Sequence, residues 1–294
     1  MAQDKNPLGR IGVWTSAWTT AQNGDGPAYS GVHDEAAAEL DSLGYGTIWL
    51  GGGPDVGYAA PLLAAAPRIT VATGILSIWQ HGAEEVAAGR AALERAHPGR
   101  FLLGLGVSHG VLAKDYAKPY SAMREYLTAL DSAPEPVPAA GRVLAALGPR
   151  MLELARDRAA GAHPYLVTAE HTAGARDILG RDALLAPEFK VVLDPDLDRA
   201  RATARDYLAM YLTLPNYTTN LRRLGFTEDD LRDGGSDRLL DAVFALGDAD
   251  TIAARAQEFL AAGADHLALQ VVTADTRTEL PLDAWRRLAE VLLP

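Results

Sequence analysis

Short apolar runs rich in β-branched residues alternate along the whole chain with longer runs rich in Ala, Leu and Arg. The short runs have the length of strands and the longer ones the spacing of helices, so each pair predicts one βα unit. Gly ends helical runs just before an apolar run in HPGRF (His97–Phe101) and LGYGTIW (Leu43–Trp49), as is typical of helix C-termini. The predicted strand–helix pairs are Ile11–Trp14 with Val32–Leu43, Thr47–Leu50 with Ala59–Ala66, Ile69–Ile75 with Glu84–Ala96, Phe101–Leu105 with Ser121–Leu130, Val143–Ala146 with Pro149–Arg158, Ala162–Val167 with Thr172–Leu179, Leu184–Leu193 with Asp196–Tyr211, and His266–Val271 with Leu282–Leu292.

The predicted strands are apolar throughout rather than alternately apolar and polar. This pattern is typical of a parallel sheet that is buried on both faces. Eight βα units predict an α/β fold of the (β/α)8 TIM-barrel class, in a single domain over residues 1–294. A doubly wound open sheet is the alternative, and only the number of units argues against it.

The seventh unit is too long for one crossover helix. About seventy residues separate Leu193 from His266, and they predict a helical insertion after strand seven, at about residues 205–262. Pro215 interrupts the first helices of this segment, and the Gly-Asp-Ala-Asp stretch at 247–250 predicts the N-cap of the last one. Insertions at this place in a barrel usually cover the site at its C-terminal rim.

Composition narrows the chemistry. Hydrophobic residues make up 48% of the 294 residues, which is enough for a large core, and the absence of Cys excludes disulfides and thiolate catalysis. A formal net charge of −11 argues against general nucleic-acid binding, which requires clustered cations. The N-terminus lacks the apolar stretch of a signal peptide and no apolar run reaches the length of a membrane span. We therefore expect a cytoplasmic protein that binds neither nucleic acid nor membrane.

A glycine-rich turn follows the fourth predicted strand, in FLLGLGVSHG (Phe101–Gly110). A dinucleotide-binding fingerprint belongs on the first strand and opens directly into a helix, and this turn does neither. At the catalytic rim of a barrel, its glycines would let a flat ring approach the backbone. His109 would then be the first titratable side chain above that ring. A plain glycine turn with a surface His remains the alternative.

Four segments of the chain carry a resemblance to a known family. They are RITVATGILSIW (Arg68–Trp79), GRFLLGLGVSHGVLAKDYAKPYSAMREYLTALD (Gly99–Asp131), VLAALGPRMLELARDRAAGAHPYLVTAEHTA (Val143–Ala173) and GADHLALQVV (Gly263–Val272). In these segments, which keep their order, the chain resembles the luciferase-like flavin and deazaflavin oxidoreductases, and more narrowly the actinobacterial members that use coenzyme F420. The resemblance implies a TIM barrel with the deazaflavin across the C-terminal ends of its strands, and hydride transfer between C5 of the ring and an unidentified small organic substrate.

Flavin-using relatives share the barrel, so FMN is the alternative cofactor and an FMN-dependent monooxygenase the alternative activity. A barrel that binds a deazaflavin without catalysis is a third interpretation. It gains weight from strand two, where some relatives carry an Asp-His pair and this chain reads WLGGGPD (Trp49–Asp55).

The resemblance also implies which residues bind the cofactor. Gly74-Ile75 matches the place on strand three where relatives bulge the backbone, often through a non-proline cis peptide. Gly148-Pro149 matches the turn after strand five that approaches the cofactor's tail. The start of the sixth helix, at residues 168–172, has free N–H groups and hydroxyls that suit a phosphate, and an ordinary capped helix is the alternative there. The expected cofactor-binding residues are Trp14, Thr73, Gly74, Ile75, Gly106, Ser108, Gly148, Pro149, Arg150, Thr168, Glu170, His171 and Thr172.

His109 stands where sugar-phosphate-oxidising relatives carry an acidic residue, and it is the candidate catalytic acid or base because its reference pKa is about 6.5. Trp79, Tyr116 and Tyr217 are the candidate substrate-binding residues, although Trp14 and Trp79 could equally be packing residues. No metal site is expected, and His33, His97, His163 and His266 are interpreted as structural. The expected partners are a small-molecule substrate and, since family members are often dimers, a second copy of the chain.

Overall fold

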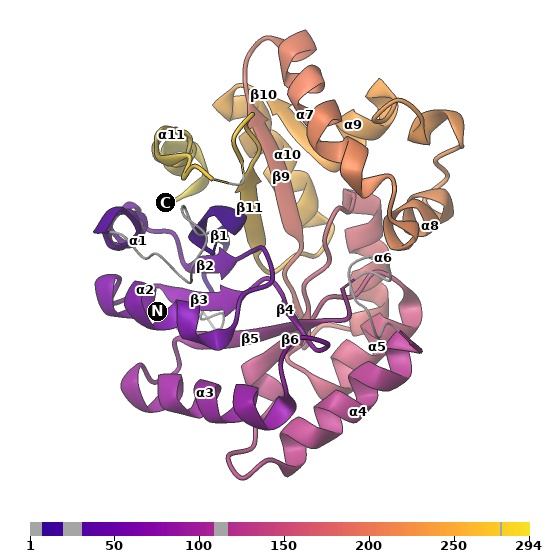
Figure 1. Ribbon diagram of the computed structural model, residues 1–294. Coiled ribbons are helices and arrows are strands. Elements are labelled where there is room, and N and C mark those ends of the chain that lie inside the picture. The colour runs from indigo at the N-terminus through magenta and orange to yellow at the C-terminus, as the bar shows by residue number, and fades with distance from the viewer. Residues whose placement is uncertain (1–7, 20–30, 109–116, 277) are drawn as a thin grey trace.

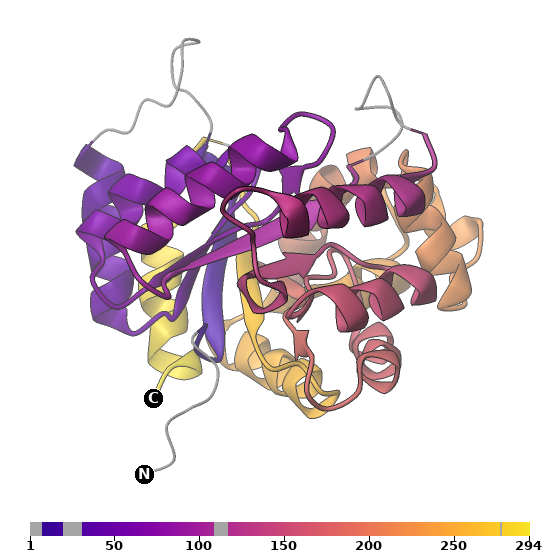
Figure 2. The ribbon, with the colours of Figure 1, turned by 90° about the horizontal axis from the view of Figure 1, so that it is seen from below.

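In the computed structural model, residues 8–19, 31–108, 117–276 and 278–294 are described. They form a curved parallel sheet with helices on its outer side (Figure 1), and the same arrangement is seen from below (Figure 2). The strands are β1 (Ile11–Thr15), β2 (Thr47–Leu50), β3 (Thr70–Thr73), β4 (Leu76–Ser77), β5 (Phe101–Gly106), β6 (Arg142–Leu144), β7 (Gly161–Ala162), β8 (Leu184–Leu185), β9 (Glu188–Leu193), β10 (Phe244–Gly247) and β11 (Leu267–Val271).

The helices follow the strands in the order that the sequence predicts. The α-helices are α1 (Gly31–Leu43), α2 (Ala59–Ala65), α3 (Ala83–Ala96), α4 (Pro119–Ser132), α5 (Pro149–Arg158), α6 (Ala169–Leu179), α7 (Leu197–Tyr211), α8 (Pro215–Arg223), α9 (Asp237–Val243), α10 (Ala249–Ala261) and α11 (Leu282–Leu292). Within the described residues, four short 3-10 helices accompany them: η1 (Ser16–Trp18), η2 (Val56–Tyr58), η3 (Ala139–Gly141) and η4 (Asp229–Leu231). None of the described helices is long and apolar enough to cross a membrane.

The strand order is β10-β9-β11-β1-β2-β3-β5-β6-β7-β8, all parallel. The ring closes at strand seven, which is β8 followed by β9. The backbone N–H groups of Leu184, Ala186 and Glu188 donate toward the strand-six side at 2.8–2.9 Å, and β9 pairs with β11 on the other side. The fold is therefore the predicted TIM barrel, and the open doubly wound sheet is excluded.

Alternate residues of each strand face opposite sides of the barrel wall, as the period of a strand requires. Ile11 and Val13 of β1, like Ile48 of β2, pack outward with the apolar faces of the helices. Trp14 and Trp49 belong to a second cluster, which fills the barrel interior. Side chains occupy the interior, so space for a ligand remains only above the carboxyl ends of the strands.

The strand of the predicted sixth βα unit, β7, is shorter than predicted. The sequence predicts Ala162–Val167, but only Gly161–Ala162 form β7, and Leu166 adopts a left-handed backbone with φ of 55°. The chain leaves the sheet here, and beyond β8 the second neighbour of β9 is β10.

The segment between α7 and α10 differs from a purely helical insertion. Pro215 begins α8 and Asp248 caps α10, its side chain accepting from Thr251 N, as predicted. Between them, residues 244–247 form β10 rather than part of a helix, and they pair with Lys190–Leu193 of β9. Figure 1 shows α8 and α9 to one side of the barrel, beyond α6 and α7. The single domain and the insertion bounds of about 205–262 stay predictions.

Candidate active site

A cavity of about 980 Å³ lies at the carboxyl ends of the strands. Its walls come from the ends of β1, β3, β5 and β6, from the start of α5, and from the end of α7 with α8. Of the predicted site residues, the cavity brings together Trp14, Gly74, Ile75, Gly106, Ser108, Gly148, Pro149, Arg150 and Tyr217.

The turn after β3 lies directly against Trp14. The Trp14 indole Nε1 donates to the Gly74 carbonyl oxygen at 2.9 Å, and the Gly74–Ile75 peptide bond is cis. A Cβ atom at Gly74 would lie 2.7 Å from Trp14 Nε1, so a side chain there would displace the indole. Gly51 has the same relation to the indole, at 2.6 Å. Glycine at these positions lets an aromatic ring and a bare backbone form one side of the cavity.

The glycine turn after β5 supports the Ile75 side chain. A Cβ atom at Gly106 would lie 2.4 Å from Ile75 Cδ1, and Ser108 follows with a left-handed φ of 54°. Thr73 is fully buried and does not line the cavity. Its hydroxyl donates to Gly104 O and accepts from Gly104 N, both at 2.8 Å, so it joins β3 and β5 beneath the site.

Two exposed arginines mark one end of the cavity, which we call the cationic end. Gly148 precedes α5 as its N-cap and Pro149 is its first residue. Arg150 lies over the Tyr120 ring at 4.2 Å, and Arg223 Nη1 lies 3.1 Å from the position of a Cβ atom at Gly148. Among the described residues, neither arginine forms an ion pair, so both guanidinium groups remain available to an anion.

The start of α6 faces away from this cavity. Thr168 Oγ1 accepts from His171 N at 3.1 Å, and Thr172 Oγ1 donates to Thr168 O at 3.0 Å. His171 Nε2 donates to Leu147 O at 2.9 Å, and burial lowers the pKa of this histidine. Glu170 and His171 line a second cavity of about 430 Å³, whereas Thr168 and Thr172 line neither cavity. The two cavities meet at Leu147, Pro149 and Arg223, which line both.

Of the candidate substrate-binding residues, one lines the large cavity, one does not, and one lies outside the described residues. Tyr217 lines the large cavity and is 7% exposed. Trp79 does not line it, and its Nε1 donates instead to Val107 O at 2.5 Å, which anchors the turn after β5. Tyr116 and the candidate catalytic residue His109 lie outside the described residues.

His163 lines the cavity, although its sequence context suggested only a structural histidine. Its Nδ1 donates to Ala186 O at 2.7 Å, its ring stacks on Trp49 at 4.1 Å, and its Nε2 has no partner among the described residues. Burial lowers the pKa of His163 to about 4, so the ring is uncharged at neutral pH. With Nδ1 protonated, Nε2 keeps a free lone pair.

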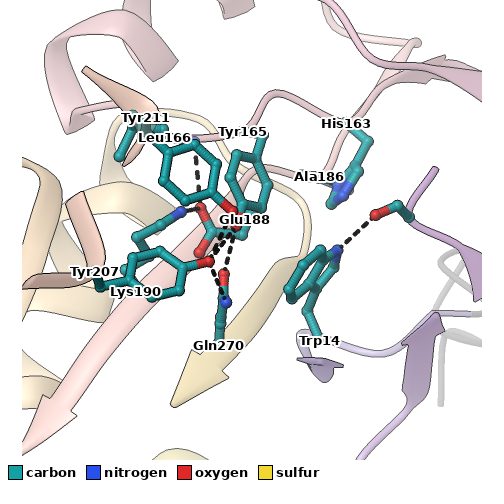
Figure 3. A network of polar contacts seen from close by, with 11 residues as sticks. Trp14, His163, Tyr165, Leu166, Ala186, Glu188, Lys190, Tyr207, Tyr211 and Gln270 are labelled. Carbon is teal, nitrogen blue, oxygen red and sulfur yellow. Dashed lines mark hydrogen bonds and ion pairs between the residues drawn. The ribbon is translucent and has the colours of Figure 1, made fainter. Parts of the chain in front are cut away.

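A buried ion pair next to the cavity, with Tyr165 beside it, also escapes sequence reasoning. Lys190 Nζ lies 2.6 Å from Glu188 Oε2, and the two side chains are 0% and 1% exposed. Burial raises the pKa of Glu188 and lowers that of Lys190 to about 8, while the opposite charge of each partner counters the shift. Lys190 Nζ also lies 3.6 Å from the centre of the Tyr165 ring (Figure 3). Charged residues two apart in the otherwise apolar run EFKVVL were the available sequence signal.

Among the described residues, no group of three or more His, Cys, Asp or Glu side chains could hold a metal ion. The only charged side chains lining the described part of the large cavity are the two arginines of the cationic end. The site can thus hold a flat ring against a glycine and tryptophan surface and an anionic group beside Arg150 and Arg223.

Comparisons with known proteins agree with this geometry. The family model for luciferase-like monooxygenases matches residues 10–266. No curated protein matches the chain significantly in sequence.

Solved structures share the fold at low sequence identity. An F420-dependent secondary alcohol dehydrogenase, solved with an F420–acetone adduct, has a TM-score of 0.71 at 13% identity, over 96% of this chain and 98% of its own. The F420-dependent tetrahydromethanopterin reductase from Methanopyrus kandleri has a TM-score of 0.72 at 15% identity, over 98% and 99%. The oxygenating constituent of 3,6-diketocamphane monooxygenase from Pseudomonas putida, solved with FMN, has a TM-score of 0.65 at 14% identity, over 97% and 96%.

Proposed function

Because the chain belongs to the luciferase-like monooxygenase family, we propose that it is an oxidoreductase that uses coenzyme F420 to reduce or oxidise a small organic substrate. The observation that carries this proposal is the cavity above the strand ends, with its glycine surface and its cationic end. When bound, F420 supplies a deazaflavin ring that exchanges hydride at C5.

The residues of the cavity fit such a cofactor. Ring binding needs a flat surface without side chains, and Gly74 and Gly106 provide it where a Cβ atom would collide with Trp14 or Ile75. The F420 tail is anionic, and the guanidinium groups of Arg150 and Arg223 stand at the cationic end to receive it.

The protein's own tasks are orientation and proton handling. Trp14, held by the Gly74 carbonyl, limits where a ring can lie. The apolar lining excludes water from the reacting atoms, which strengthens the electrostatic interactions there. His109 is proposed to give or take the proton that accompanies hydride transfer, since a histidine titrates near neutral pH.

The test is a titration of the purified protein with F420, followed by the fluorescence of the deazaflavin, with FMN titrated in parallel. The proposal expects saturable binding of F420 at micromolar concentration and weaker binding of FMN. Failure of F420 to bind would overturn it.

An FMN-dependent monooxygenase is the second candidate. It is favoured by the FMN-containing neighbour, and by the cationic end, which suits the phosphate of FMN as well as the F420 tail. A yellow protein as purified, with oxygen uptake in the presence of substrate, would establish this alternative instead. Binding of F420 without turnover of any substrate would support a non-catalytic barrel.

A further inference from the structure

Four aromatic side chains that line the cavity are in contact with one another. We call Trp14, Tyr165, Tyr211 and Tyr217 the aromatic wall, and all four line the cavity. Tyr165 is their centre, with ring centroids at 5.3 Å from Trp14, 5.6 Å from Tyr211 and 6.0 Å from Tyr217. Tyr211 and Tyr217 lie 5.5 Å apart in an edge-to-face arrangement. These spacings are those of interacting aromatic pairs, so the wall is one packed unit.

The hydroxyl groups of Tyr165 and Tyr211 bond to each other and to that of Tyr207. Tyr165 OH lies 2.8 Å from Tyr207 OH and 3.0 Å from Tyr211 OH, and the last two are 2.9 Å apart. Gln270 completes the network (Figure 3), because its Oε1 accepts from Tyr165 OH and its Nε2 donates to Tyr207 OH. Tyr165 and Tyr211 therefore offer a ligand mainly the carbon surface of their rings.

The wall also presents no charge. Burial raises the pKa of Tyr165, Tyr207 and Tyr217 well above the usual value, so these phenols stay protonated. Lys190, under the Tyr165 ring, is fully buried and paired with Glu188, so its ammonium group does not reach the cavity.

Helix α8 carries one residue of this wall and one of the two arginines. Tyr217 stands near its start and Arg223 is its last residue. Six residues of α-helix span about 9 Å, so the backbones of Tyr217 and Arg223 lie roughly that far apart along the helix. The cavity is thus lined both by an uncharged aromatic surface and by the arginines of the cationic end.

We propose that the tyrosines of the aromatic wall, Tyr165, Tyr211 and Tyr217, bind the substrate, and that the substrate is an uncharged aromatic molecule of about two fused rings. As a statement about substrate, this inference rests on the proposed function, in which the cationic end holds the cofactor's tail. A cavity of about 980 Å³ exceeds what a tricyclic ring needs and leaves room for such a partner. Ring-on-ring contact adds to simple burial, so an aromatic ligand is favoured over a saturated one of equal size.

Three probes with related skeletons test the inference by calorimetric titration of the protein without cofactor. These are 2-naphthol, its saturated analogue decahydro-2-naphthol, and the anion 2-naphthoate. We expect 2-naphthol to bind about tenfold more tightly than either of the others, which corresponds to about 1.4 kcal/mol. Equal or tighter binding of naphthoate, or of the saturated alcohol, would overturn the inference.

Variants locate the binding. Tyr217→Leu should weaken binding of 2-naphthol about tenfold, whereas Tyr217→Phe, which keeps the ring, should change it by less than about twofold. Tyr58→Leu, at a tyrosine outside the cavity, is the control. Naphthol binding that is unchanged in Tyr217→Leu contradicts the inference, and unfolding curves of both Tyr217 variants show whether the fold is kept.

An F420 titration of the same preparation separates the two proposals. F420 binding without a preference for naphthol overturns the inference alone. A naphthol preference that Tyr217→Leu abolishes, without F420 binding, supports the aromatic site and overturns the proposed cofactor.

Discussion

The buried pair Glu188–Lys190 allows a stability prediction whose size and pH dependence both follow from the structure. Removing one partner of a buried ion pair leaves an uncompensated charge, which costs about 3–5 kcal/mol. Lys190→Met keeps most of the side-chain volume but leaves the Glu188 carboxylate without its cation. Its second oxygen, Oε1, already has no hydrogen-bond partner among the described residues. We therefore expect the melting temperature to fall by roughly 6–20 °C.

The loss should depend on pH in a definite direction. Burial raises the pKa of Glu188 in the folded protein, and removing Lys190 raises it further. A carboxyl group with a raised folded-state pKa imposes a penalty that is fully present above that pKa and disappears below the unfolded value of about 4.3. The difference between Lys190→Met and wild type should thus be largest at neutral pH and shrink as the pH falls toward about 4.3.

The matched control is the double variant Glu188→Gln/Lys190→Met. It removes both charges, and Gln still offers an oxygen to Leu166 N, which now donates to Glu188 Oε2 at 3.2 Å. The double variant should recover most of the lost stability and show no extra pH dependence. Urea unfolding at several pH values measures all three proteins. A loss below about 1 kcal/mol in Lys190→Met, or one that is constant with pH, would refute the reasoning.

Three further predictions concern the site. His109→Ala should lower the turnover number far more than the affinity for F420, and equal losses in steady-state rate and F420 titration would make His109 a binding residue instead. Arg223→Gln should weaken F420 binding about tenfold and reduce its salt dependence, because one contact with the anionic tail is lost. The control is Arg222→Gln, which removes a cation that is already paired with Glu228. Equal losses of F420 affinity in the two variants would count against the role of the cationic end. Thr168→Ala should cost about 1 kcal/mol of unfolding free energy, since Thr168 Oγ1 caps α6 by accepting from His171 N, whereas Thr168→Ser should cost little; equal stability of the two variants in urea would contradict the capping role.

The sequence predicts the barrel because it contains eight βα units, whose strands are apolar on both faces and whose helices carry clear end signals. Asp248 and Pro149 are recognisable as helix starts from their types and neighbours alone. Residues 244–247 are not recognisable as a strand, because an apolar run of four after a helical pattern fits either structure. Only the free edge of β9 decides its conformation, and that edge exists in the folded chain alone.

Less of the candidate site than of the fold can be predicted from the sequence, because its geometry also exists only in the folded chain. Gly74, Gly106 and Gly148 could be named because they resemble family positions. The roles of His163, Tyr165 and Arg223 depend on contacts between segments that lie far apart in the chain. Arg222 and Arg223 are adjacent and chemically identical. Which of them faces Gly148 depends on how α8 is oriented in the folded protein.

The pairing of β10 with β9 constrains how this barrel can be re-engineered. Phe244–Gly247 cover the backbone edge of Lys190–Leu193, which β7 would cover in a regular barrel. The helices that follow α7 could be replaced by those of a homologue only if the new segment contains an equivalent of residues 244–247, or if these four residues of the original chain are kept. A chimaera without these residues would expose unpaired N–H and C=O groups on β9, and such an edge promotes intermolecular association.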